Sequence, residues 1–77
     1  MSRRAKLIER IRARPPQADW DDVRALLEDF GWTLARQGKE RVFTKPGEYP
    51  IVVGTVGGRK VKRVYLAMIC ERLGLDE

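Results

Sequence analysis

The stretch at residues 19–44, DWDDVRALLEDFGWTLARQGKERVFT, contains the change of hydrophobic period that decides the fold. In its first half the apolar residues recur at three- and four-residue steps, which is the spacing of one face of an α-helix. These residues are Trp20, Val23, Leu26, Leu27 and Phe30. Asp19 is expected to occupy the N-cap of this helix, with Asp22 at the capping-box position, and Gly31 is expected to end it.

After Gly31 the apolar residues alternate with polar ones, which is typical of β-strands. The pattern predicts strands at residues 32–36, 41–44 and 49–55, and a turn at residues 37–40 in which Gly38 supplies a permissive backbone. Strands this close together, joined by short turns, form an antiparallel meander.

Two further helices are expected outside this region. Residues 2–14 carry Leu7 and Ile11 on one helical face, and Pro15-Pro16 ends that helix. After a glycine-containing loop at residues 57–60, helical spacing returns and continues to Gly74. The order α-α-β-β-β-α predicts an α+β fold, in which helices pack on one face of a three-stranded antiparallel sheet. Residues 1–18 read as an N-terminal basic helix and linker, and residues 19–77 as the main domain.

The amino-acid composition argues against several classes of function. The 77 residues include no histidine and one cysteine, so neither a disulfide nor a zinc or other metal centre is expected, and no cofactor is implied. No apolar run approaches the ~18 residues of a membrane span. We therefore expect a cytoplasmic protein without a membrane partner.

Basic residues are concentrated in two segments of this chain, whose net charge is +5. Arg59, Lys60, Lys62 and Arg63 follow Gly57-Gly58 and contain no acid between them. Cations at a helix start oppose the helix dipole, which favours a bound phosphate there over a merely soluble surface. The basic side chains of the first helix are open to two interpretations, a second phosphate-binding face or an ordinary polar helix surface. They are Arg3, Arg4, Lys6, Arg10, Arg12 and Arg14.

Several segments together resemble the HicA family, the small toxins of HicA–HicB toxin–antitoxin modules. They are the helix end Leu27 to Trp32, the hairpin Gly38 to Phe43 followed by Pro46, the strand Ile51 to Val53, the loop Gly57-Gly58, Lys60 or Lys62 with Val64-Tyr65, and the ending Ile69, Leu73 to Leu75. The resemblance covers about three quarters of the chain. It implies a fold like the double-stranded-RNA-binding domain, mRNA as substrate and a HicB-like antitoxin as partner.

At the position of the family's catalytic histidine this chain has Glu40, preceded by Lys39 where the family has serine. Glu40 is therefore the candidate catalytic base, with Lys39, Arg41 or Lys45 stabilising the charge that develops on the phosphate. The alternative is that residues 39–41 form a solvated hairpin tip. Whether the chain is an enzyme stays open on this evidence.

Three functions follow as hypotheses. The first is a HicA-like RNA-binding protein that contacts the backbone of mRNA or another structured RNA through Lys39, Arg41, Lys45, Arg59, Lys60, Lys62 and Arg63. The second is an active mRNA interferase toxin that uses Glu40 and the nearby cations. The third is a non-catalytic protein-interaction module that binds a HicB-like antitoxin.

Overall fold

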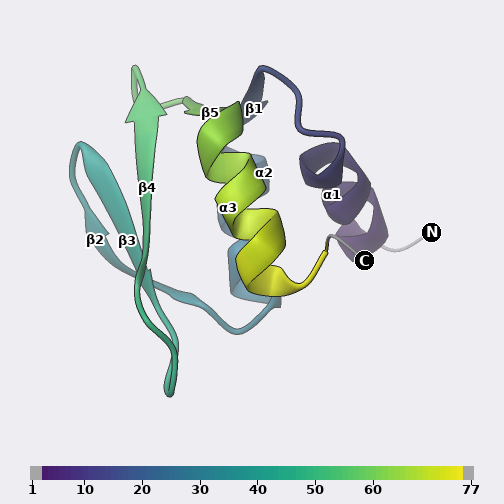
Figure 1. Ribbon diagram of the computed structural model, residues 1–77. Helices are drawn as coiled ribbons and strands as arrows, with labels where there is room; N and C mark the ends of the chain where they lie inside the picture. The colour runs from purple at the N-terminus through teal and green to yellow at the C-terminus, as the bar shows by residue number, and fades with distance from the viewer. Residues whose placement is uncertain (1–2, 76–77) are drawn as a thin grey trace.

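The computed structural model describes residues 3–75, which form three helices and one antiparallel sheet of five strands (Figure 1). In chain order the elements are α1 (Arg3–Arg12), β1 (Gln17–Asp19), α2 (Trp20–Asp29), β2 (Thr33–Gln37), β3 (Glu40–Thr44), β4 (Ile51–Val56), β5 (Lys60–Lys62) and α3 (Arg63–Leu73). The strands lie in the order β1-β5-β4-β3-β2. The first helix was expected to begin at residue 2, which lies outside the described residues. The same holds for the ends of the two expected domains, at residues 1–2 and 76–77.

The α+β class is confirmed, but the three-stranded sheet was wrong because two short strands extend it. β1 and β5 have three residues each and pair with one another, with Ala18 opposite Val61. Each strand buries only its central residue: Ala18 is 8% exposed and Val61 is fully buried. One apolar residue between two polar ones is too short a pattern to distinguish a strand from a loop. The partner strand also lies about forty residues away in the sequence, so the pattern along the chain gave no local signal for either strand.

The glycines expected to end two helices do so. Gly31 follows the last residues of α2 with a φ of 91°, and Gly74 caps α3 with a φ of 70°. Both angles lie in the left-handed region, where a side chain is disfavoured and glycine is not. Asp19 is the N-cap of α2, as expected, but its side chain makes no capping hydrogen bond.

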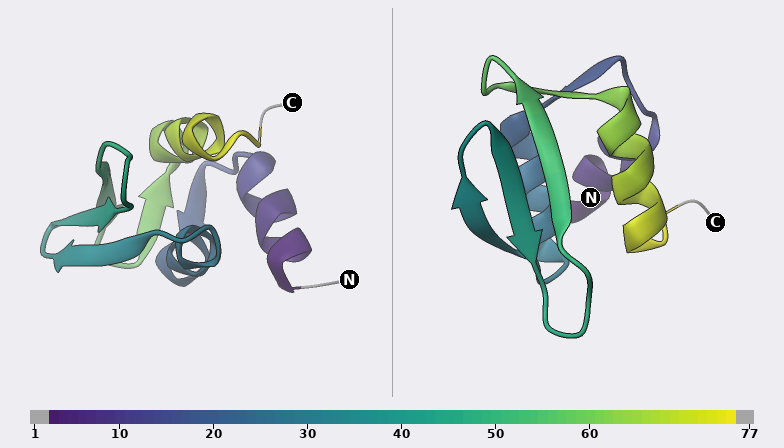
Figure 2. Two further views of the ribbon diagram at one scale, coloured as in Figure 1. Left: turned by 90° about the horizontal axis from the view of Figure 1, so that it is seen from below. Right: turned by 60° about the vertical axis from the view of Figure 1, so that its left-hand side comes forward.

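One hydrophobic core lies between the helices and the sheet. The three helices lie on the same side of strands β2–β4, and the further views show α2 behind the sheet and α3 beside β4 (Figures 1 and 2). Trp20 of α2 packs on Phe43 of β3 with 5.6 Å between the ring centres. Leu7 and Ile11 of α1 are buried in this same core. The division of the chain at residue 18 stays a prediction, and that position falls inside β1.

Successive residues of β3 and β4 point to opposite faces of the sheet, as they must in a strand. Phe43 and Arg41 face the helices, whereas Glu40 and Val42 face the other way, toward solvent. On that outer face Gly54 of β4 lies opposite Glu40. The hydroxyl of Tyr65, from α3, lies 2.6 Å from the position that a Cβ on Gly54 would occupy. Gly54 therefore provides the space in which the Tyr65 ring packs.

Candidate nucleic-acid interface

Arg41 joins two turns at one end of the sheet. Its Nη1 donates a hydrogen bond to the carbonyl of Gly38, in the turn between β2 and β3. Its Nη2 donates to the carbonyl of Gly58, in the turn between β4 and β5, at 3.3 Å. The guanidinium also lies over the ring of Trp20, with 4.9 Å from its carbon to the ring centre. Arg41 is thus engaged by the protein itself, and it holds the two turns side by side.

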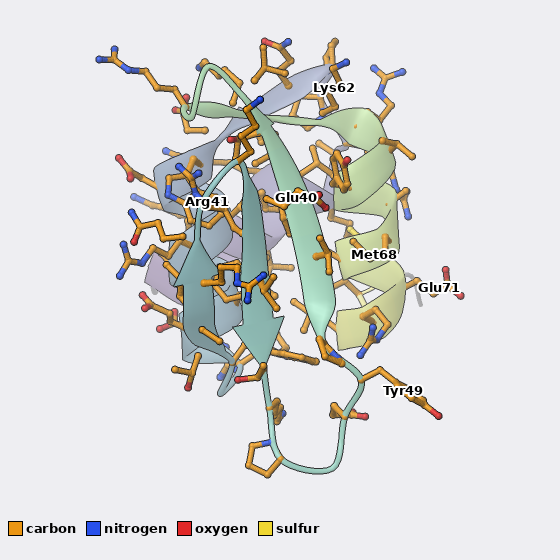
Figure 3. All side chains as sticks on the ribbon, turned by 90° about the vertical axis from the view of Figure 1, so that its left-hand side faces the viewer. Glu40, Arg41, Tyr49, Lys62, Met68 and Glu71 are labelled. Carbon is orange, nitrogen blue, oxygen red and sulfur yellow. The ribbon has the colours of Figure 1, made fainter. Side chains whose placement is uncertain are left out.

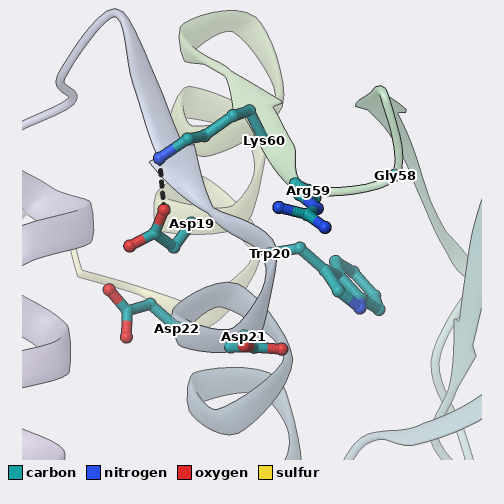
Figure 4. Close-up of a pocket in the computed structure, with 7 residues that line it drawn as sticks. All are labelled: Asp19, Trp20, Asp21, Asp22, Gly58, Arg59 and Lys60. Carbon is teal, nitrogen blue, oxygen red and sulfur yellow. Dashed lines mark hydrogen bonds and ion pairs between the residues drawn. The ribbon is translucent and has the colours of Figure 1, made fainter.

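The turn between β4 and β5 presents Arg59 to solvent. Gly57 and Gly58 have φ angles of 61° and 72°, a conformation that other residues rarely adopt. The backbone of Arg59 is fixed at both ends, since its N–H donates to the Val56 carbonyl at 3.2 Å and its carbonyl accepts from the Trp20 N–H at 2.7 Å. Its side chain is exposed (Figure 4). A fixed backbone with a free guanidinium suits a residue that contacts a ligand.

Lys60 is paired with Asp19 on the neighbouring strand β1. Its Nζ donates a hydrogen bond to the Asp19 carboxylate, and the two form an ion pair (Figure 4). The hydrogen bond from Lys60 and then its charge lower the pKa of Asp19 below 3.8, and the charge of Arg10 adds to this. The pair lies at the rim of a hollow of about 690 Å³. The hollow is lined by Asp19, Trp20, Asp21, Asp22, Gly58, Arg59 and Lys60.

Two more of the expected phosphate ligands bind the protein. Arg63 donates from Nε to the carbonyl of Arg14 at 2.9 Å, which fastens the segment between α1 and β1 to the start of α3. Lys45 donates from Nζ to the carbonyl of Phe30 at 2.9 Å, beside the C-terminus of α2. The four cations at residues 59–63 therefore do not all need an external anion, because Lys60 and Arg63 have internal acceptors.

Three of the seven expected cations have no such acceptor among residues 3–75. Lys39, Arg59 and Lys62 are exposed, and within the described part of the chain none of them makes a side-chain hydrogen bond or ion pair. Lys39 and Arg59 belong to the two turns that Arg41 joins. Lys62 lies at the end of β5, on the same edge of the molecule as the β4–β5 turn (Figure 3). The structure thus brings these three free cations to one end of the sheet.

Glu40 lies apart from some of the cations that were expected to assist it. It is exposed on the outer face of β3, whereas Arg41 extends to the helix face of the same strand (Figure 3). Lys45 is engaged at the end of α2. Of the three cations expected beside Glu40, this leaves Lys39, whose side chain is exposed and has no hydrogen-bond partner among the described residues. The hydroxyl of Tyr65, which was not among the expected site residues, packs over Gly54, and Gly54 is the residue opposite Glu40 on β4.

The basic face of α1 is partly used for packing against α2. Arg4 lies over the ring of Phe30, 4.3 Å from its centre, and donates to the carbonyl of Asp29 at 3.3 Å. Arg10 forms an ion pair with Asp22 at 3.3 Å. These contacts favour the interpretation of α1 as a polar helix surface, at least for Arg4 and Arg10.

Residues 3–75 contain neither a metal site nor a membrane-spanning helix. No three acidic, cysteine or histidine side chains lie together in residues 3–75 as a metal site requires. None of the helices in this part of the chain is long and apolar enough to cross a membrane. No family model, no curated protein and no solved structure matches this chain.

Proposed function

We propose that this chain is a HicA-like RNA-binding protein of the toxin–antitoxin type, which acts in the cytoplasm and contacts the RNA backbone through Lys39, Arg59 and Lys62. The observation that carries the proposal is the set of three exposed cations at one end of the sheet for which residues 3–75 offer no acceptor. Phosphate contacts of this kind provide most of the affinity of sequence-independent nucleic-acid binding.

Two further features support the proposal. The order of α2, β2, β3, β4 and α3 is compatible with the helix, three strands and helix that the resemblance implies, although β5 lies between β4 and α3 and joins the sheet. Arg41 bonds to the backbone of the turns that carry Lys39 and Arg59, so the backbone beneath these cations is held in place before RNA binds. Ordering in advance lowers the entropic cost of binding.

A second candidate function is mRNA cleavage with Glu40 as the base. The observation that favours it is the exposed carboxylate of Glu40 on the outer face of the sheet, opposite the glycine that the Tyr65 hydroxyl covers. A carboxylate and a phenol on one surface are two groups that can transfer protons to and from RNA. The protein partner in either case is a HicB-like antitoxin, as the resemblance implies.

The experiment is a binding and cleavage assay with a structured RNA, read on one gel over a series of salt concentrations. The triple variant Lys39→Ala, Arg59→Ala, Lys62→Ala is expected to lose salt-sensitive binding, and each single change is expected to lower the slope of log K against log salt by about 0.7–0.9. The matched control is Arg72→Ala, an arginine of α3 that donates to the carbonyl of Tyr49, before the start of β4 and so at the opposite end of that strand from the β4–β5 turn.

Each outcome distinguishes the candidate functions. Binding that survives in the folded triple variant would remove these three residues as the interface. Cleavage that Glu40→Gln abolishes, with binding intact, would establish the nuclease. A folded protein that neither binds nor cleaves RNA would leave the protein-interaction module that binds a HicB-like antitoxin.

A further inference from the structure

The outer edge of β2 is an unpaired strand edge beside a groove. β2 is the last strand of the sheet, and within the described residues it pairs only with β3. A groove of about 450 Å³ runs along it, lined by the whole strand and by Arg24 and Glu28 of α2. The strand contains no proline and no lysine, and four of its five residues are exposed. The other edge strand, β1, has only three residues. An exposed edge of this kind is a template for another strand.

The two charged residues of α2 along this groove, Arg24 and Glu28, have opposite signs, so two copies of the groove placed head to tail would match in charge. Arg24 and Glu28 lie one helical turn apart, 3.4 Å from Nε to Oε2, and their side chains are 42% and 48% exposed. The chain leaves α2 at Asp29 and enters β2 at Thr33. Glu28 is therefore at the level of the start of β2, and Arg24 is at the level of its end. Arg36 of β2 is the third charged residue of the groove. Against the two charges of α2, a partner with a uniform charge would meet one unfavourable group, whereas a partner with the inverse order of charges would meet none.

We propose that β2 pairs with β2 of a second copy of this chain, antiparallel and about a two-fold axis at Ala35. In this arrangement Thr33 lies opposite Gln37 of the second copy, and the two sheets become continuous. The axis also places Glu28 of each copy at the level of Arg24 of the other, so two intermolecular ion pairs form. A contact in which residue i meets residue j twice is what a two-fold dimer requires.

The irregularity of β2 is compatible with this axis. The pairing of β2 with β3 shifts register between Leu34 and Arg36, so Ala35 has no partner on β3. The residues on either side of Ala35 form two short regular segments. Residues 33–34 of one copy can pair with residues 36–37 of the second copy. The register shift at Ala35 then lies at the centre of the interface.

The test is the oligomeric state of the whole chain, measured by sedimentation equilibrium without RNA at about 5 μM to 1 mM, a range that includes typical weak and transient dimers. We expect a monomer–dimer equilibrium. Arg24→Glu and Glu28→Arg each create two like-charge contacts per dimer, and each is expected to weaken the dimer about tenfold. The double variant Arg24→Glu, Glu28→Arg restores both ion pairs and is expected to restore the dimer. Ala35→Pro, at a position unpaired with β3, is expected to abolish it, and circular dichroism checks that each variant is folded.

Two outcomes would overturn the proposal. One is a chain that stays monomeric over the whole range, which would leave the β2 edge to a strand of another protein. The other is a dimer that the two charge reversals and Ala35→Pro leave unchanged, which would place the contact elsewhere. The double variant also restores the ion pair within α2, so a mixture of the two single variants separates an intermolecular contact from a loss of stability within this helix. In the mixture each α2 keeps its like-charge pair, but a mixed dimer has opposite charges at both intermolecular contacts, so a mixed dimer is expected to form.

Discussion

The guanidinium of Arg41 lies over the ring of Trp20, with 4.9 Å between its carbon and the ring centre, and from there it reaches the carbonyls of two turns. A planar group with several donors can stack on an aromatic ring and bind two carbonyls at once, which the single ammonium of lysine cannot do. Arg41 is for this reason a positioning residue of the proposed interface, since it connects the turns that carry Lys39 and Arg59.

The first prediction concerns this connection. Arg41→Lys is expected to lower the free energy of unfolding by about 1–3 kcal/mol, because it removes a carbonyl bond and the stacking on Trp20. The measurement is urea unfolding followed by tryptophan fluorescence. The control is Arg36→Lys, the same change at an exposed position of β2, where an effect within about 0.5 kcal/mol is expected. Equal effects of the two substitutions would contradict the role of Arg41.

The sequence predicted those parts of the fold that short-range patterns determine. The apolar spacing of α2 and the glycines at positions 31 and 74 are local signals, and both helices end where these glycines are. The pairing of β1 with β5 depends on contacts between Ala18 and Val61, which no local pattern reveals. The period of two in β3 already separates Glu40 from Arg41, so their opposite faces could have been inferred from the sequence.

The candidate site was harder to predict than the fold, because a charged residue does not reveal its partner. The pairing of Lys60 with Asp19 follows from strands β1 and β5, which the sequence did not indicate. The bonds of Lys45 and Arg63 end on backbone carbonyls, which have no sequence signature at all. Of seven cations that look equivalent in the sequence, only the geometry distinguishes Lys39, Arg59 and Lys62.

The second prediction concerns Gly54. An alanine Cβ there would lie 2.6 Å from the Tyr65 hydroxyl and 3.0 Å from its Cζ, so the ring would have to move. We expect Gly54→Ala to destabilise the protein by about 1–3 kcal/mol. Gly38→Ala is the control, because a Cβ at position 38 meets nothing within 4 Å. In a double-mutant cycle, Tyr65→Ala is expected to reduce the cost of Gly54→Ala, and an unchanged cost would contradict the steric explanation.

The third prediction follows from the lowered pKa of Asp19. Lys60 lowers the pKa of this carboxyl below 3.8 in the folded protein. A depressed folded pKa gives stability that is present above the unfolded pKa and is lost as the pH falls through the folded pKa. We therefore expect a small part of the acid destabilisation below about pH 4 to come from this exposed pair, and salt to reduce it. Thermal unfolding from about pH 5 to pH 2 at low salt measures it.

The controls for this pH effect are two asparagine substitutions. Asp19→Asn is expected to remove that part of the acid destabilisation. Asp21→Asn removes the same charge from a neighbouring carboxylate for which the described residues offer no ion-pair partner, and it is expected to leave the contribution of the pair in place. A pH profile that Asp21→Asn flattens as much as Asp19→Asn does would show that overall charge, and not the pair with Lys60, is responsible.

The last prediction links the same pair to RNA. Because Asp19 occupies the ammonium of Lys60, Lys60→Ala is expected to weaken RNA binding less than Lys62→Ala does. Asp19→Asn releases Lys60, and we expect RNA affinity at low salt to rise about threefold to tenfold with a steeper salt dependence. In the Asp19→Asn background, Lys60→Ala is expected to cancel this gain in affinity. In the Asp21→Asn background, Lys60→Ala is not expected to cancel a gain in affinity. Equal losses of RNA affinity in Lys60→Ala and Lys62→Ala would contradict this prediction. They would show that RNA displaces Asp19 from Lys60, so that the ion pair does not prevent Lys60 from contacting RNA.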